Sequence, residues 1–194
     1  MFINTIKIDE IVAKIGQHIG SHSALISIGE HTEIDVKKLI QELNAAEVKF
    51  MGGIFPKVIH NNSIHEKGIV INTLKNVEAL KIIENISAGD LEIPKITFNP
   101  NTSYSAITYV DGLTSNISNY LSELYENYGM RTNYFGGGAG SLSLEQKPCV
   151  FSNQGFYEDA AVICVMQMKS NIGVKHGWKK LHGPLIVTKA EKNT

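Results

Sequence analysis

The chain has 194 residues, of which 43% are hydrophobic, and its 18 basic and 19 acidic residues give a formal net charge of −1. This length predicts one domain, which can bury roughly 70% of the surface that its unfolded chain exposes. The balanced charge contains no run of like sign and gives no basic surface for nucleic acid or anionic membranes. Neither is therefore an expected partner.

The two cysteines are too few for a disulfide-stapled secreted domain. Cys164 lies in the apolar run 160–166, where a buried, hydrophobic role is expected. That run is far shorter than the roughly 20 residues that a membrane span needs. The first residues lack the basic flank and long apolar stretch of a signal peptide. We therefore expect a cytoplasmic protein.

The first half alternates patterns typical of helices and strands, with apolar residues recurring every three or four positions in the helical segments. The expected elements are a helix over residues 9–19 capped by Asp9, a strand over 24–28, a helix capped by Asp35, an extended segment over 49–56, a strand over 68–74, and a helix capped by Asn76 that turns Val77, Leu80, Ile83 and Ile86 inward. Residues 87–105 carry two prolines and several Asn and Ser residues, which indicates a loop with a short strand at 95–98.

The second half begins with one more strand and helix and then loses helical periodicity. The expected elements are a strand over 106–110, a turn at Asp111-Gly112, a helix capped by Thr114 and ended by Gly129, and strands over 132–140, 149–153, 160–169, 171–176 and 183–189. Short gaps between the last strands predict an antiparallel meander. The whole chain, residues 1–194, is expected to form one α/β or α+β domain with a mixed sheet and about four helices in its first two thirds.

The segment 134–141 has the sequence Tyr-Phe-Gly-Gly-Gly-Ala-Gly-Ser. Its four glycines in five positions leave the main chain uncovered by side chains. Its N–H groups can approach a ligand or another strand closely, so a packing role, a ligand-lining role and a phosphate cradle all remain open. It matches neither G-x-G-x-x-G, because Ser141 stands where a glycine is needed, nor the P-loop pattern.

Met51-Gly52-Gly53 is a second glycine site. If it lies beside the first, the two would leave a groove of bare main chain suited to a small polar ligand such as an amino acid. A β-bulge is the alternative.

Seven histidines invite a metal interpretation, but none has the Cys or carboxylate neighbours typical of a zinc site. His18 and His22 are four residues apart, yet Gly20 between them is expected to end the helix. No G-x-S-x-G elbow or catalytic Cys signature occurs, although a hydrolase with an unrecognised Ser, Cys or His site stays an alternative. The sequence predicts no cofactor. Trp178, in His176-Gly177-Trp178, either stacks on a ligand or plugs the end of the strands.

The order of these motifs resembles the N-terminal domain of FIST proteins, found in bacterial signal transduction and in eukaryotic F-box proteins. The resemblance is clearest over residues 106–190 and uses a short succession of motifs. These are Met51-Gly52-Gly53, Asp111-Gly112, the 134–140 segment, Val150 to Gly155, the 159–165 strand, His176-Gly177-Trp178 and Val187 to Ala190.

This resemblance implies a sensory module that binds a small ligand, an amino acid being one candidate, and passes that state to a signalling protein. The family's C-terminal companion domain is a further implied partner, and its absence would make this chain a fragment or a short stand-alone form. No catalytic residue can be carried over. The expected ligand-lining residues are Gly52, Gly53, Tyr134, Gly136, Gly137, Gly138, Ser141, Asn153, His176 and Trp178. A protein-interaction scaffold without a ligand remains an alternative.

Overall fold

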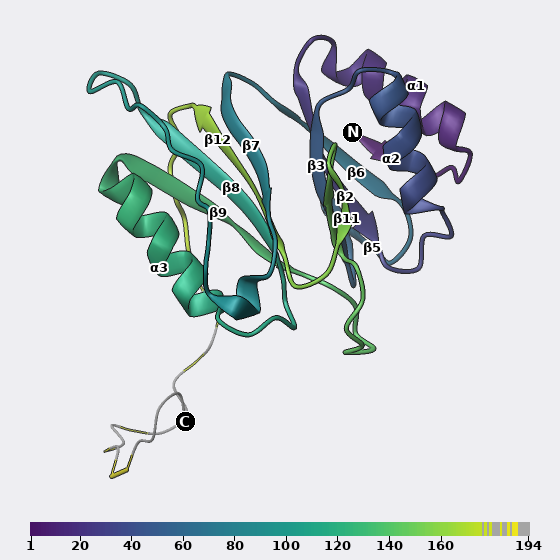
Figure 1. Cartoon of the computed structure of the whole chain (residues 1–194). Coiled ribbons are helices and arrows are strands. Elements are labelled where there is room, and N and C mark those ends of the chain that lie inside the picture. The colour runs from purple at the N-terminus through teal and green to yellow at the C-terminus, as the bar shows by residue number, and fades with distance from the viewer. Residues whose placement is uncertain (176, 178, 180–182, 184–185, 187, 190–194) are drawn as a thin grey trace.

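Two β-sheets lie face to face between two outer layers of helices (Figure 1). The computed structural model describes residues 1–175, 177, 179, 183, 186, 188 and 189. The helices formed by these residues are α1 (Ile8–Ile19), α2 (Val36–Ala45), α3 (Ile117–Tyr128) and the short 3-10 helices η1 (Ile86–Ala88) and η2 (Gly129–Arg131). Within this part of the chain, no helix has the length and apolar character needed to cross a membrane.

The strands divide into a larger sheet, a smaller sheet and a hairpin. The larger sheet has the order β1 (Phe2–Ile3), β6 (Ile69–Leu74), β2 (Ser23–Gly29), β3 (Phe50–Phe55), β10 (Val150–Ser152) and β11 (Gly155–Tyr157). The smaller sheet has the order β7 (Val77–Ile83), β12 (Ala161–Gln167), β8 (Tyr104–Asp111) and β9 (Thr132–Ala139). The hairpin consists of β4 (Val58–His60) and β5 (Ser63–His65).

Each sheet contains one parallel pair joined by a helix. β2 and β3 run parallel with α2 between them, and β8 and β9 run parallel with α3 between them. A parallel pair needs such a crossover, and its helix packs on a face of the sheet. The remaining strand pairs are antiparallel. The two crossovers therefore explain why helices cover both outer faces while the inner faces meet.

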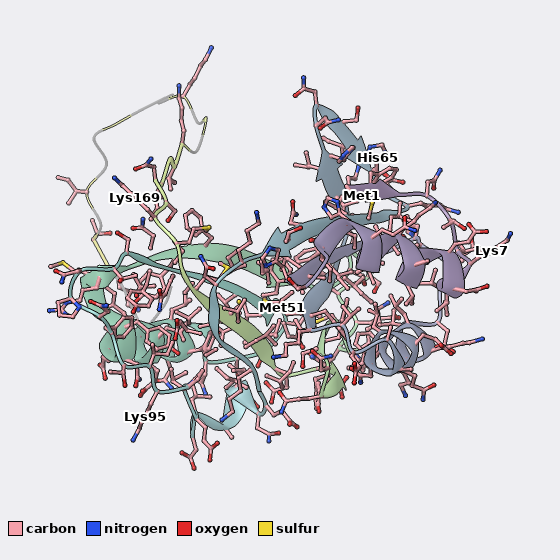
Figure 2. All side chains as sticks on the ribbon, turned by 90° about the horizontal axis from the view of Figure 1, so that it is seen from above. Met1, Lys7, Met51, His65, Lys95 and Lys169 are labelled. Atoms are coloured by element: carbon pink, nitrogen blue, oxygen red, sulfur yellow. The ribbon has the colours of Figure 1, made fainter. Side chains whose placement is uncertain are left out.

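The core follows these layers because successive strand residues point to opposite faces. In β12, Ile163 packs toward α3, whereas Val162 and Cys164 face the larger sheet. Met51 of β3 lies in the layer between the sheets, near the middle of the molecule in Figure 2. Strand β12 is an inner strand of the smaller sheet, between β7 and β8, and it is buried on both faces.

Asp35 caps α2 as predicted, because its side chain accepts a hydrogen bond from the Lys38 main-chain N–H at 3.0 Å. Gly129 ends α3 with a positive φ of 59°, also as predicted. The predicted caps at Asp9 and Thr114 are wrong. Helix α1 begins at Ile8 with Lys7 rather than Asp9 at the N-cap, and α3 begins after Asn116 rather than Thr114.

The predicted helix after Asn76 is wrong, and three α-helices occur in the described residues where about four were expected. Residues 77–83 form β7, which pairs along β12 from Ala161 to Met166. Asn76 has a φ of 51° and turns the chain from one sheet to the other instead of capping a helix. The free edge of the buried β12 strand thus outweighs a local helical pattern.

The antiparallel meander is also wrong as a single unit. Among the described strands that follow β8, only β10 and β11 are consecutive strands that pair with each other. Strand β12 belongs to the smaller sheet, and β9 runs parallel to β8. Residues 95–98 and 171–175 form no strand, although Ile96 and Phe98 pack against the α3 core. His176, which ends the predicted strand 171–176, lies outside the described residues, as do residues 184, 185 and 187 of the predicted strand 183–189.

Candidate functional site

A cavity of about 290 Å³ opens between the two sheets beside the exposed part of β9. We name it the glycine cleft and define it by Ser27 of β2, Phe55 of β3, Asn72 of β6, Tyr109 of β8, and Gly136 and Gly137 of β9. It lies where the packed layer between the sheets gives way to solvent. Cavities of roughly this size, apolar with a few polar groups, are typical of small-molecule sites.

A pair of hydroxyl groups joins the two sheets inside the glycine cleft. The Ser27 Oγ and Tyr109 Oη atoms lie 3.0 Å apart, and the Tyr109 ring meets the Phe55 ring edge-to-face with centroids 4.7 Å apart. Burial raises the pKa of Tyr109 above its usual value, although the Ser27 hydrogen bond opposes this. The phenol therefore stays protonated at neutral pH and can donate or accept a hydrogen bond.

The glycines of β9 differ in what their missing side chains make possible. A Cβ on Gly136 would lie 1.9 Å from the Thr108 carbonyl oxygen, so packing requires glycine there. A Cβ on Gly137 would meet no atom within 4 Å. Both residues are exposed in the strand, and Gly137 pairs with Tyr109 across β8. Packing accounts for glycine at Gly136 alone, whereas Gly137 borders open space.

The Gly52-Gly53 pair serves packing and does not line the glycine cleft. A Cβ on Gly52 would lie 2.3 Å from Phe151 Cζ and 2.4 Å from the Ile26 carbonyl oxygen. Gly53 lies against the Phe55 ring and the Ala139 Cβ. The Gly140 N–H donates to the Ile54 carbonyl oxygen at 2.8 Å. The two glycine segments are therefore close although they belong to different sheets, and Gly136 and Gly137 of β9 line the glycine cleft whereas Gly52 and Gly53 do not.

Tyr134 and Gly138 contact other parts of the protein instead. Tyr134 packs on the α3 side of the sheet, and its hydroxyl donates to the Gly129 carbonyl oxygen at 3.0 Å. This bond satisfies a carbonyl at the end of the helix, where such groups lack helical partners. Burial, followed by the nearby Tyr125, raises the pKa of Tyr134 to about 12. A Cβ on Gly138 would lie 3.4 Å from the Gly112 Cα, which is an ordinary van der Waals contact, so packing does not require glycine there.

Three of the four hydrogen-bonding positions of the Asn153 side chain are used within the protein. Its Oδ1 accepts from the Phe50 N–H at 3.0 Å, and its Nδ2 donates to Val48 O and Asn44 Oδ1, each at 2.7 Å. These bonds tie the β10–β11 turn to the start of β3 and to the end of α2. The geometry gives Asn153 a structural role.

We expect Asn153→Ala to lower the free energy of unfolding by roughly 2 kcal/mol, because it leaves the Phe50 N–H and the Val48 carbonyl oxygen without their hydrogen-bond partner. Chemical denaturation measures this change. Asn62→Ala, in the exposed turn of the β4–β5 hairpin, is the control and should alter stability by less than about 0.5 kcal/mol. Equal, small effects for both variants would contradict the structural role.

Ser141 lies at the edge of a second cavity, of about 730 Å³, at the carboxyl ends of β2 and β3. We name this the end cavity and define it by Ile28, Glu30, Ile34, Ile54, Ser141 and Phe156. The Ser141 hydroxyl lies 2.6 Å from the Ser143 hydroxyl. His176 and Trp178, the remaining expected ligand residues, lie outside the described residues.

Sequence reasoning missed the residues that complete the glycine cleft from the larger sheet. Ser27 interrupts the otherwise apolar segment 24–28, whereas Asn72 follows the apolar residues 69–71 and is exposed. A polar residue within a buried strand is a usable signal, because burial without a hydrogen bond is costly. Tyr109 carried no such signal, since aromatic residues are common in strands.

The described residues gather few of the groups that catalysis or metal binding uses. Among them, no hydrogen bond joins a Ser or Cys side chain to a His, and no three His, Cys, Asp or Glu side chains cluster as metal ligands would. Burial raises the pKa of both Cys149 and Cys164 to about 12, and for Cys149 the adjacent Asp111 contributes.

Neither cysteine should therefore react with iodoacetamide at pH 8 in the folded protein, because the thiolate fraction is only about one in ten thousand. Mass spectrometry of the alkylated protein measures this. Full labelling after denaturation in guanidinium provides the positive control. Stoichiometric labelling of Cys149 or Cys164 under native conditions would show that the inner layer opens to solvent.

The fold and its cavities define a four-layer α/β domain with a small-molecule-sized cleft between its sheets. The family model described as the FIST N domain matches residues 23–194, and the chain belongs to the FIST family. This family is regarded as a sensory domain of signalling proteins, not as an enzyme family. No curated protein and no solved structure matches the chain. The resemblance inferred from the order of the sequence motifs is thus confirmed.

Proposed function

We propose that this domain senses a small polar metabolite in the glycine cleft, with an amino acid as the first candidate. The observation that carries the proposal is the exposed main chain of Gly136 and Gly137 facing the Ser27–Tyr109 hydroxyl pair. Strand β9 is the edge of the smaller sheet, so part of its main-chain N–H and C=O groups point away from β8. A polar ligand can bond to these groups where no side chain intervenes.

The groups around the cleft suit a ligand that carries both a carboxylate and an amino group. Lys57 lines the cleft, and its Nζ lies 3.0 Å from Glu66 Oε1 in a pair that is about half exposed. Such a pair contributes little to stability, so its ammonium group is available to a ligand carboxylate. The Asn72 amide and the Ser27 hydroxyl can accept hydrogen bonds from an amino group.

Sensing also requires that binding alter a surface that a partner can read. The cleft takes residues from β2, β3 and β6 of one sheet and from β8 and β9 of the other. A ligand that contacts both sheets would stabilise one relative arrangement of their edges. We infer that a downstream signalling protein or a companion domain recognises this arrangement.

A thermal-shift screen against amino acids and other small polar metabolites tests the proposal. A specific ligand present at about 100 times its dissociation constant should add about 2.7 kcal/mol to the free energy of unfolding. Gly137→Leu should abolish that shift, because the added Cβ would meet no atom within 4 Å and the side chain would extend into the cleft that Gly137 lines. Gly173→Leu, another position with no atom near the added Cβ, is the matched control. Equal shifts in both variants would place the ligand elsewhere.

A further inference from the structure

The end cavity lies apart from the glycine cleft. It opens where β2 and β3 reach their carboxyl ends, next to the first turn of α2. Ligands of open α/β sheets commonly bind at this position, outside the carboxyl ends of parallel strands. Its walls are apolar at Ile28, Ile34, Ile54 and Phe156. The two cavities share no lining residue, so they are separate sites.

Glu30 is a carboxylate held in the wall of the end cavity. Its side chain is only 10% exposed. Oε2 accepts a hydrogen bond from the Leu142 N–H at 3.0 Å, which fixes the loop between β9 and β10 against the end of β2. The other oxygen, Oε1, makes no hydrogen bond with any described residue, and the His31 Nε2 lies 3.8 Å from it.

The Glu30 carboxylate is hydrogen-bonded through Oε2 but not through Oε1, so Oε1 can accept a hydrogen bond from a further donor. A carboxylate group can accept about four hydrogen bonds, and a buried charge is costly unless it is paired. The Oε1 atom is not sealed from solvent, since Thr132 Oγ1 is the buried side-chain atom that lacks a partner within the described residues. Because Glu30 lines the end cavity and Oε1 keeps access to solvent, a donor bound in the cavity can approach this oxygen.

We propose that the end cavity binds a primary amine with an apolar body, and that Glu30 is the counter-ion of its ammonium group. The ammonium N–H would donate to Oε1, while the carbon chain would lie against the apolar walls. Lys37 and Lys147 also line the cavity, but both are exposed and extend into water. Asp35 is exposed as well, and it already accepts the Lys38 N–H. Glu30 is therefore the buried charged group that determines which sign of charge the ligand carries.

Calorimetric titration of the whole chain with n-hexylamine tests this site, with 1-hexanol and hexanoate as neutral and anionic probes of the same length. We expect hexylamine to bind at least about tenfold more tightly than either, which is the discrimination expected of a hydrogen bond to a charged group. Tighter binding of hexanoate would mean that Lys37 and Lys147 dominate, and it would overturn the proposal. Equal binding of hexanol would do the same.

Two variants separate this site from the glycine cleft. Glu30→Gln keeps an oxygen that can accept the Leu142 N–H but removes the charge, so hexylamine should bind at least about tenfold more weakly. Gly137→Leu, which fills the glycine cleft, should bind hexylamine as the unmodified chain does. Unchanged hexylamine affinity in Glu30→Gln would refute the role of Glu30. Loss of affinity in Gly137→Leu would place the amine in the glycine cleft.

Discussion

Gly52→Ala is expected to lower the free energy of unfolding by roughly 3 kcal/mol or more, at the upper end of the overpacking range. The added Cβ would lie 2.3 Å from the Phe151 ring and 2.4 Å from the Ile26 carbonyl oxygen. Gly52 pairs with Phe151 across β3 and β10, and with Ile26 across β3 and β2. The methyl group must therefore displace a buried ring or separate two central strands of the larger sheet.

Gly16→Ala is the matched control for Gly52→Ala. Gly16 lies within α1, and a Cβ there would meet no atom within 4 Å. Because alanine is the better helix former, this variant should raise stability by up to about 1 kcal/mol. Urea denaturation of both variants gives the comparison. A Gly52→Ala protein as stable as the unmodified chain would show that Phe151 moves freely, and the packing role would fail.

Asp111→Ala is expected to cost roughly 3–5 kcal/mol, because it removes the acceptor of three hydrogen bonds and each donor left unsatisfied costs about 1–3 kcal/mol. Asp111 ends β8 and is only 1% exposed. Its Oδ1 accepts from the Leu113 N–H at 3.0 Å, and its Oδ2 accepts from the Asp159 N–H at 2.8 Å and from the Gln146 side chain. The carboxyl group therefore joins the turn after β8, the start of β12 and the loop before β10.

Alanine at this position would leave those partly buried donors without an acceptor. Asp90→Ala, in an exposed loop, removes the same group and should change stability by less than about 0.5 kcal/mol. Calorimetric melting of both variants measures the difference. If Asp111→Ala and Asp90→Ala melted at the same temperature, the hydrogen bonds of the Asp111 carboxylate would not contribute to the stability of the fold.

Local sequence patterns predicted the outer layers of this fold well. The cap at Asp35 and the spacing of Leu39, Ile40 and Leu43 located α2, and Gly129 located the end of α3. They failed at β7, whose partner residues in β12 lie 78 to 89 positions later in the chain. No window of local sequence contains that pairing, so the pattern after Asn76 predicts a helix that does not form.

The candidate site was predictable only in part for the same reason. The exposed glycines of β9 were visible as a run, and two of them line the glycine cleft. Ser27 and Tyr109 meet across the two sheets although they are 82 residues apart. Glu30 owes its burial to the loop around Leu142, 112 residues later. Such sites depend on how the two sheets pack against each other. The local hydrophobic pattern that predicts a strand does not specify that packing.

The sensing account depends on one physical claim: the bare main chain of β9 contacts a small polar ligand within the glycine cleft. Proton–nitrogen correlation spectra of the labelled protein, recorded while a mixture of the proteinogenic amino acids is added, test it most directly. The account predicts that the amide signals of Gly136 and Gly137 shift in a saturable manner, together with those of Ser27 and Tyr109. Saturable shifts confined to other parts of the chain, with those four signals unmoved, would contradict it.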